Sequence, residues 1–172
     1  MRAAVVTISD RSFRGERPDV SGPVLKQLLE GAGADLIEMT VIPDDVTLIV
    51  RTLTQLADEW RCDLIITTGG TGLSPRDVTP EATRQVIEKE LPGMALAIQQ
   101  ESLQRTPYAM LSRGVAGARG RTLILNLPGS PKAVRECFAV VQPVLAHAVK
   151  LLRDENPYAE AEHLPARGGL PR

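Results

Sequence analysis

Residues 63–81 read DLIITTGGTGLSPRDVTPE, and their pattern indicates the fold class. It opens with Asp63 to Thr68, whose centre, Leu64-Ile65-Ile66, is apolar on both faces. Such a run is typical of a strand in a parallel sheet that helices cover on both sides. After a glycine-rich turn, Thr79-Pro80-Glu81 predicts a helix start, with a capping hydroxyl, a proline in the first turn and an acid at the positive end of the helix dipole.

The same succession of strand, polar turn and helix continues on both sides of this stretch. Short apolar runs predict strands at 3–8 and 35–42. Apolar residues at helical spacing predict helices at 21–31, 46–60, 93–104 and 131–152. Their expected caps are Ser21, either Asp44 or Asp45, and Ser130. Strands that alternate with helices predict an α/β protein of three layers, α/β/α, around a mainly parallel mixed sheet.

Three further parts of the sequence have patterns of their own. Residues 10–19 are polar and contain glycine and proline, which predicts an exposed loop. The runs 107–111 and 121–125 predict strands, joined as a hairpin or an extended arm because three glycines lie between them. In the last helix Pro143 should cause a kink, and Val144 and Leu151 should point inward with its other apolar residues.

The composition excludes several classes of protein. Hydrophobic residues make up 43% of the 172 residues, and the balance of 20 basic and 21 acidic residues argues against a general nucleic-acid binder. No apolar run is as long as a membrane span, and the first strand is too short for a signal peptide, so a soluble cytoplasmic protein without membrane attachment is expected. Residues 1–152 should form one domain, and 153–172, rich in Pro, Gly and charge, a tail that packs weakly on the surface.

Four polar segments follow predicted strands: Ser9-Asp10-Arg11, Pro43-Asp44-Asp45, Thr67 to Gly72, and Asn126 to Ser130. Parallel strands place such loops at one edge of the sheet, where open α/β sheets bind ligands. The glycines let the backbone approach a ligand and turn its N–H groups toward an anion. The third segment matches neither a Walker A loop nor G-x-G-x-x-G, so on its own it fits a tight turn without a ligand about equally well.

Two longer motifs make the pattern specific. Thr67 to Glu81, together with Asn126 to Lys132, resembles the paired signatures of the MogA/MoaB family, whose relatives include the G domain of gephyrin. The similarity begins at Ile8-Ser9-Asp10-Arg11, continues through Ile42-Pro43-Asp44 and Leu111-Ser112-Arg113-Gly114, and reaches the last helix. The residues after Leu152 lie outside it.

The resemblance implies a three-layer molybdenum cofactor biosynthesis fold and a specific reaction. Family members usually form trimers, bind ATP with Mg²⁺, and transfer AMP to the terminal phosphate of molybdopterin, which gives adenylylated molybdopterin and pyrophosphate. A molybdenum insertase is the implied partner that receives the product. The alternative is a MoaB-type protein that binds molybdopterin or a nucleotide without efficient transfer. An unrelated nucleotide-binding α/β protein would need both long motifs to match by chance.

The resemblance also implies the site residues. Asp44 and Asp77 should be catalytic and should hold the Mg²⁺. Substrate binding is implied for residues of the four segments and of the 111–114 motif: Ser9, Asp10, Thr68, Gly69, Gly70, Thr71, Gly72, Ser112, Arg113, Asn126, Pro128, Gly129, Ser130 and Lys132. These residue types suit the chemistry, because an ionised phosphate needs no general base and the work consists of positioning two anions and stabilising the leaving pyrophosphate. Carboxylates are the oxygen ligands that Mg²⁺ prefers.

Several of these residues also have a purely structural interpretation. Asp44 could cap the helix at 46–60, although Asp45 becomes the cap if Asp44 is catalytic. Asp77 could pair with Arg76 or bond its own loop, and Ser130 is expected to be a helix cap whose backbone N–H faces a phosphate. Arg113 and Lys132 could be solvated. The adenylate is expected against 69–72 and 128–130, the pterin near Ser112 and Arg113, and the two aspartates between them.

Overall fold

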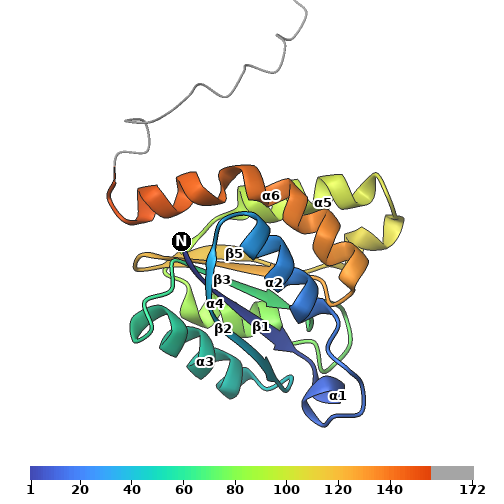
Figure 1. Cartoon of the computed structure of the whole chain (residues 1–172). Coiled ribbons are helices and arrows are strands. Elements are labelled where there is room, and N and C mark those ends of the chain that lie inside the picture. Colours follow the sequence, from blue (N-terminus) through green and yellow to red (C-terminus); the bar gives the residue numbers. More distant parts are fainter. Residues whose placement is uncertain (156–172) are drawn as a thin grey trace, which may run out of the picture.

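A six-stranded sheet forms the centre of the molecule, with the strand order β2-β1-β3-β6-β5-β4 (Figure 1). The computed structural model describes residues 1–155. Four strands are parallel: β1 (Arg2–Ile8), β2 (Asp35–Ile42), β3 (Leu64–Thr68) and β6 (Thr122–Leu127). At one edge, two short strands continue the sheet in antiparallel pairing: β5 (Ala116–Arg119) and β4 (Lys89–Glu90). The mainly parallel mixed sheet is confirmed.

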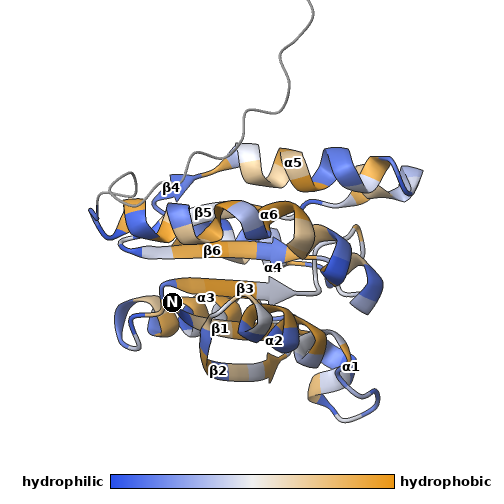
Figure 2. Ribbon diagram, turned by 45° about the horizontal axis from the view of Figure 1, so that its top comes forward, coloured by the Kyte–Doolittle hydropathy of each residue, from blue (hydrophilic) through white to orange (hydrophobic). Residues whose placement is uncertain are grey.

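Helices cover both faces of this sheet and complete the three predicted layers (Figure 1). One face packs against α2 (Ser21–Gly31), α5 (Pro92–Leu103) and α6 (Pro131–Leu152). The other packs against α3 (Val46–Asp58) and α4 (Thr79–Val86). The central strands are apolar on both sides because their alternate residues enter the two separate cores, as Leu64 and Ile65 do. Figure 2 shows this concentration of hydrophobic residues along β3 and β6.

Two segments differ from their predicted structure. Residues 107–111 form a 3-10 helix, η1 (Pro107–Leu111), so the predicted strand is wrong. Pro107 at its start and the Thr106 side chain, which accepts a hydrogen bond from Tyr108 N, favour a tight turn over a strand. The hairpin itself exists, but β5 and β6 form it around Gly120, whose φ is +51°. Within the predicted loop 10–19, one helical turn, α1 (Asp10–Phe13), is capped by Ser9.

The predicted caps are correct at two of four helices. Asp45 caps α3 by accepting from Leu48 N at 2.9 Å, and Ser130 caps α6 by accepting from Ala133 N at 3.2 Å. Ser21 and Thr79 were expected to cap but lie inside their helices. Their hydroxyls donate instead to carbonyls of distant loops, Ser21 to Gly129 and Thr79 to Gly69. A cap signal in the sequence cannot reveal such a competing partner, because the partner comes from another part of the chain.

The last helix runs without interruption from Pro131 to Leu152, with Pro143 inside it. Val144 and Leu151 are exposed, so their predicted inward orientation is wrong, whereas Val141, Leu145 and the other core residues of this helix are buried. Its C-terminus is fixed, since Arg153 Nε donates to Asp63 Oδ1 at 2.9 Å. The rest of the predicted tail, 156–172, lies outside the described residues. Within residues 1–155, none of the helices has the length and apolar character that crossing a membrane requires.

Candidate active site

The carboxyl ends of the parallel strands surround a cavity of about 340 Å³. We call it the polar cavity. Eight of the predicted site residues line it, contributed by the loops after β1, β2, β3 and β6: Ser9, Asp44, Thr68, Gly69, Gly70, Asp77, Gly129 and Ser130. Residues that are more than a hundred positions apart in the sequence therefore meet at one edge of the sheet, as expected for loops that follow parallel strands.

A second cavity, of about 420 Å³, lies between α5, η1, β5, β6 and the first turns of α6. We call it the apolar cavity because Leu96, Ile98, Val115 and Leu125 are among the residues that line it. Three predicted site residues line it: Ser112, Asn126 and Pro128. Pro128 lines the apolar cavity and its neighbour Gly129 lines the polar cavity, so the two cavities adjoin across the loop that follows β6.

Asp44 is the most unusual side chain in the polar cavity. It is 8% exposed, and its Oδ2 accepts a hydrogen bond from Asp10 N at 2.8 Å, while Asp10 Oδ1 accepts from Asp44 N at 3.1 Å. Its other oxygen, Oδ1, is buried and has no hydrogen-bond partner among residues 1–155. Burial raises the pKa of this carboxyl group, and the negative charges of Asp10 and Asp77 act in the same direction. Asp44 does not cap α3, because Asp45 does.

Asp77 lies on the loop that joins β3 to α4. Its Oδ2 accepts from Ser74 N at 2.9 Å, so it bonds its own loop, as one of the two structural interpretations expected. Arg76 pairs instead with Asp10, with Nε 2.8 Å from Oδ2, and also donates from Nη2 to the Asp44 carbonyl at 2.8 Å. The Arg76 guanidinium lowers the pKa of Asp10. Asp77 still lines the polar cavity, near enough to Asp44 for the two charges to interact.

The glycine-rich turn has a geometry that side chains would prevent. Gly69 and Gly70 have φ values of +98° and +63°, which residues with a Cβ rarely adopt. A Cβ at Gly69 would overlap the Ile8 carbonyl oxygen, and one at Gly70 would overlap Thr79 Oγ1 and lie 2.9 Å from Asp44 Oδ1. Both glycines therefore allow the ends of β1 and β3, and the buried carboxylate of Asp44, to approach one another closely.

Comparison with known proteins agrees with this architecture. Residues 4–147 match the family described as "probable molybdopterin binding domain". The chain belongs to this family. It is 41% identical over 150 residues to molybdopterin adenylyltransferase of Helicobacter pylori strain J99, covering 86% of this chain and 85% of that protein. The MoaB structure from Thermus thermophilus superposes with a TM-score of 0.85 at 48% identity, covering 90% of this chain and 97% of that one.

Larger proteins contain the same domain. The molybdenum cofactor synthesis protein cinnamon of Drosophila melanogaster is 46% identical over 165 residues, which include 95% of this chain. The chain spans only 28% of the length of that protein. The family fold therefore occurs both as a chain of this length and as part of a longer protein.

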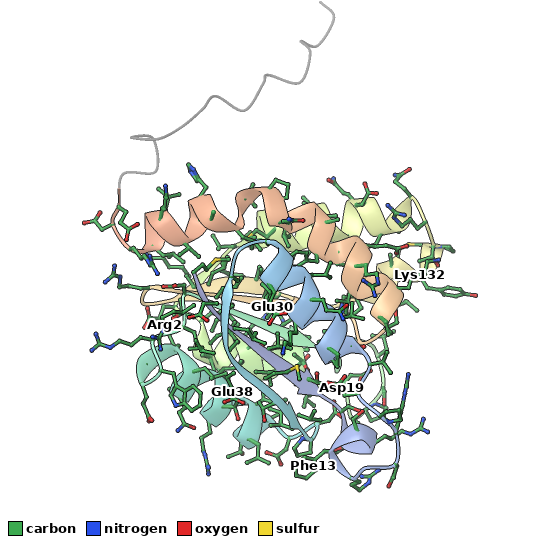
Figure 3. All side chains as sticks on the ribbon, viewed as in Figure 1. Arg2, Phe13, Asp19, Glu30, Glu38 and Lys132 are labelled. Carbon is green, nitrogen blue, oxygen red and sulfur yellow. The ribbon has the colours of Figure 1, made fainter. Side chains whose placement is uncertain are left out.

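The other eight site residues expected from the family resemblance do not line the polar cavity: Asp10, Thr71, Gly72, Ser112, Arg113, Asn126, Pro128 and Lys132. Asn126 is nearly fully buried, with Nδ2 3.0 Å from both Thr67 Oγ1 and Thr83 Oγ1, and its Oδ1 accepts from Val115 N. Thr71 and Gly72 line neither cavity. Arg113 bonds the loop that carries Asp77, and Lys132 is exposed on the first turn of α6 (Figure 3). Their proposed roles in substrate binding stay predictions.

Asp19 and Ser21 line the polar cavity, although neither was predicted as a site residue. Asp19 lies beside the strand ends at the first turn of α2 (Figure 3), where it accepts from the backbone of Ser21 and Gly22 and from the Thr7 hydroxyl at 2.8 Å. Ser21 Oγ donates to the Gly129 carbonyl at 2.6 Å. The sequence signal for Asp19 was an aspartate two residues before a helix. In this pattern the side chain typically accepts from the backbone N–H groups of the residues that follow.

The donor set of the polar cavity fits Mg²⁺ bound together with a nucleotide. Such ions are held by one or two carboxylates, and waters and substrate phosphates fill the other positions. Asp44 offers a buried oxygen without a hydrogen-bond partner, and Asp77 offers a second carboxylate nearby. Residues 1–155 contain no group of three or more metal-binding side chains that could hold an ion without a substrate.

Proposed function

We propose that this chain is a molybdopterin adenylyltransferase, which transfers AMP from ATP to the phosphate of molybdopterin and releases pyrophosphate during molybdenum cofactor biosynthesis. The observation that carries the proposal is the buried oxygen of Asp44, which has no hydrogen-bond partner within 1–155 and lies beside Asp77 in a polar cavity built on glycine turns. Without a cation or donor, a buried carboxylate oxygen of this kind costs stability. The names of the Helicobacter pylori relatives support the same activity.

The two cavities divide the substrates between them. The polar cavity suits the phosphates of ATP, because the helix that starts at Pro131 directs its N-terminus and the Ser130 backbone toward it. The apolar cavity suits the pterin ring, since its walls are aliphatic and a few polar groups, including Ser112, can orient a heterocycle. The loop at 126–130 borders both cavities, so the phosphate of molybdopterin would meet the α-phosphate of ATP at this loop.

Asp44 and Asp77 would hold the Mg²⁺, which neutralises charge on the phosphates when it is bound. The residues of this chain position the reactants and supply N–H donors to the departing pyrophosphate. The attacking phosphate is ionised near neutral pH, so the chain needs no general base, and His147 does not line the polar cavity. We also propose that the reaction takes place in the cytoplasm and that a molybdenum insertase consumes the adenylylated product.

The direct test incubates purified protein with molybdopterin, ATP and Mg²⁺ and assays for adenylylated molybdopterin and pyrophosphate. Formation of both products, dependent on all three additions, is the expected result. Binding of molybdopterin without either product would favour the alternative, a MoaB-type binding protein. Failure to bind molybdopterin or ATP would exclude both functions.

Gly70→Ala is expected to weaken the binding of ATP with Mg²⁺ more than the binding of molybdopterin. The new Cβ would displace Asp44 Oδ1, which belongs to the lining of the polar cavity, and Thr79 Oγ1, which bonds the Gly69 carbonyl. Gly33→Ala is the matched control, because Gly33 has a similar φ of +77° and open space around its Cα. Both variants should lose about 1–2 kcal/mol of stability from backbone strain, but calorimetry should detect weakened nucleotide binding only in Gly70→Ala. Equal losses for both ligands would mean that the turn shapes the whole domain.

A homotrimer in solution is also part of the proposal and is implied by the family resemblance. The support from the structure is the apolar surface on α5 and η1, where Leu96, Leu103, Tyr108, Met110 and Leu111 are exposed. Sedimentation velocity at micromolar concentration should show a trimer that Met110→Glu weakens. Phe13→Glu is the control, since Phe13 is similarly exposed on α1, far from α5 (Figure 3). A monomeric wild-type protein would contradict the prediction.

A further inference from the structure

The segment 112–115 borders the apolar cavity and is bonded through Arg113 to the loop that carries Asp77. Ser112, Gly114 and Val115 line the apolar cavity, whereas the side chain of Arg113 extends to the loop that carries Asp77. Two hydrogen bonds and one close approach of the backbone hold this segment against β6. Val115 N donates to Asn126 Oδ1 at 3.1 Å, Asn126 N donates to the Val115 carbonyl at 2.9 Å, and a Cβ at Gly114 would lie 3.0 Å from the Asn126 carbonyl oxygen. The segment consequently has little freedom to move away from β6.

Arg113 connects this segment to both ends of the loop at 72–77. Its Nε donates to the Gly72 carbonyl at 2.8 Å, and its Nη2 donates to the Asp77 carbonyl at 2.7 Å. Nη1 forms an ion pair with Glu81 in the first turn of α4, and the backbone N–H of Arg113 donates to the Thr71 carbonyl at 3.0 Å. One guanidinium group therefore holds the start of the loop, its end and the following helix at fixed separations.

Few other bonds hold this loop in place. The carboxylate of Asp77 and its backbone N–H both bond Ser74, inside the loop itself. Among residues 1–155, the remaining hydrogen bonds between 72–77 and other segments come from the side chain of Arg76, which reaches Asp10 and the Asp44 carbonyl. Arg113 is thus the residue that bonds the Asp77 carbonyl directly, whereas Arg76 and Thr79 hold the chain on either side of Asp77.

We propose that Arg113 is a positioning residue that couples the two cavities, an inference that rests on the proposed function. A heterocycle in the apolar cavity contacts the Ser112–Val115 segment and so restricts Arg113. Arg113 in turn fixes Asp77 where it can share a divalent cation with Asp44. Binding in the apolar cavity therefore strengthens binding of the metal–nucleotide in the polar cavity, and the reverse holds because linkage is reciprocal. Lysine cannot replace it, since three partners in three directions need the planar, five-donor guanidinium.

The test compares Arg113→Lys with Arg119→Lys. Arg119 is the control because its guanidinium also makes three hydrogen bonds, two to the Asp58 carboxylate and one to the Val86 carbonyl, but it lines neither cavity. Amide hydrogen exchange is measured first, on the free proteins. Exchange across residues 72–77 should accelerate about tenfold or more in Arg113→Lys, since two charge-assisted bonds to the loop are lost, and should match the wild-type protein in Arg119→Lys.

Ligand coupling is measured next, with an ATP analogue that has a methylene bridge between the α and β phosphorus atoms and so cannot release pyrophosphate. In the wild-type protein, molybdopterin should tighten the binding of this analogue with Mg²⁺ about fivefold or more. Arg113→Lys should lose that coupling and need about 10–100-fold more Mg²⁺ for half-maximal turnover. Glu81→Gln, which leaves both carbonyl bonds in place, should keep most of the coupling.

The two readouts separate the inference from the function on which it rests. Wild-type exchange rates across 72–77 in Arg113→Lys would overturn the inference whatever the activity, and so would intact coupling in that variant. Loss of coupling in Arg119→Lys as well would also overturn it, because the effect would then be a general loss of stability. Faster exchange confined to Arg113→Lys, with no adenylyl transfer in the wild-type protein, supports the positioning role and counts against the proposed function alone.

Discussion

Replacement of Asp77 by asparagine is expected to lower the rate of adenylyl transfer about 10²–10³-fold, the usual effect of losing one electrostatic contact to the reacting groups. The amide keeps the size of the side chain, and its oxygen can still accept the bond from Ser74 N that holds the loop. It removes the negative charge that a divalent cation needs. Steady-state kinetics at saturating ATP and molybdopterin, over a range of Mg²⁺ concentrations, measures the effect.

The control for this substitution is Asp45→Asn. Asp45 is next to Asp44 but lies outside both cavities, and asparagine caps a helix about as well as aspartate does. This variant should keep both wild-type turnover and wild-type stability. Near-normal turnover by Asp77→Asn, with the fold intact by circular dichroism, would disprove the catalytic assignment of Asp77.

Asp44→Asn is expected to lower turnover by a similar factor of about 10²–10³, while the protein becomes more stable near neutral pH. Burial raises the pKa of Asp44 above its value in the unfolded chain. The folded state therefore binds more protons than the unfolded state between the two pKa values, and the free energy of unfolding falls as the pH rises through this window. Above the folded pKa the full penalty for a buried charge is present, and asparagine abolishes it.

Chemical denaturation of both proteins as a function of pH checks this result. The stability advantage of Asp44→Asn should be largest at neutral pH and should shrink as the pH falls toward the pKa of an unfolded aspartate. Asp10 should show the opposite behaviour: Arg76 lowers its pKa, so its contribution is present at neutral pH and is lost in acid. A less stable Asp44→Asn protein with normal turnover would show that Asp44 is structural.

The buried carboxylate of Asp44 lowers stability but serves activity, and several connected hydrogen bonds and ion pairs hold the residues around it in place. The reciprocal bonds between Asp10 and Asp44 hold the buried carboxylate from one side, and Arg76 joins this pair to the glycine-rich loop. Three carboxylates, those of Asp10, Asp44 and Asp77, interact electrostatically here, and the nearby Arg76 forms its ion pair with Asp10. The negative charge that remains is what a magnesium–nucleotide complex would neutralise.

Much of this protein could be predicted from local patterns. Residues 64–66 are apolar on both faces of their strand, which indicated a buried parallel strand, and helical periodicity indicated the helical layers on each side. Both features could be predicted because they depend only on residues within one element. It could also be predicted that four distant residues would meet at one site, since parallel strands bring their carboxyl ends to the same edge of the sheet. These residues are Ser9, Asp44, Gly70 and Ser130. The roles of Asp45 and Ser130 as caps needed only a bond to a residue three positions away.

Other features depended on partners that no local pattern contains. Thr79 and Ser21 looked like caps, but their hydroxyls bond carbonyls of other loops, and Ser21 and Gly129 are 108 residues apart. Arg113 looked like a substrate ligand, and the tertiary structure uses all three of its nitrogens on the loop of Asp77 and on Glu81. A polar side chain bonds whichever partner the fold places nearest. Sequence therefore determined which groups are available and where the strands end, and only the packing of distant segments decided which groups remain free to meet a ligand.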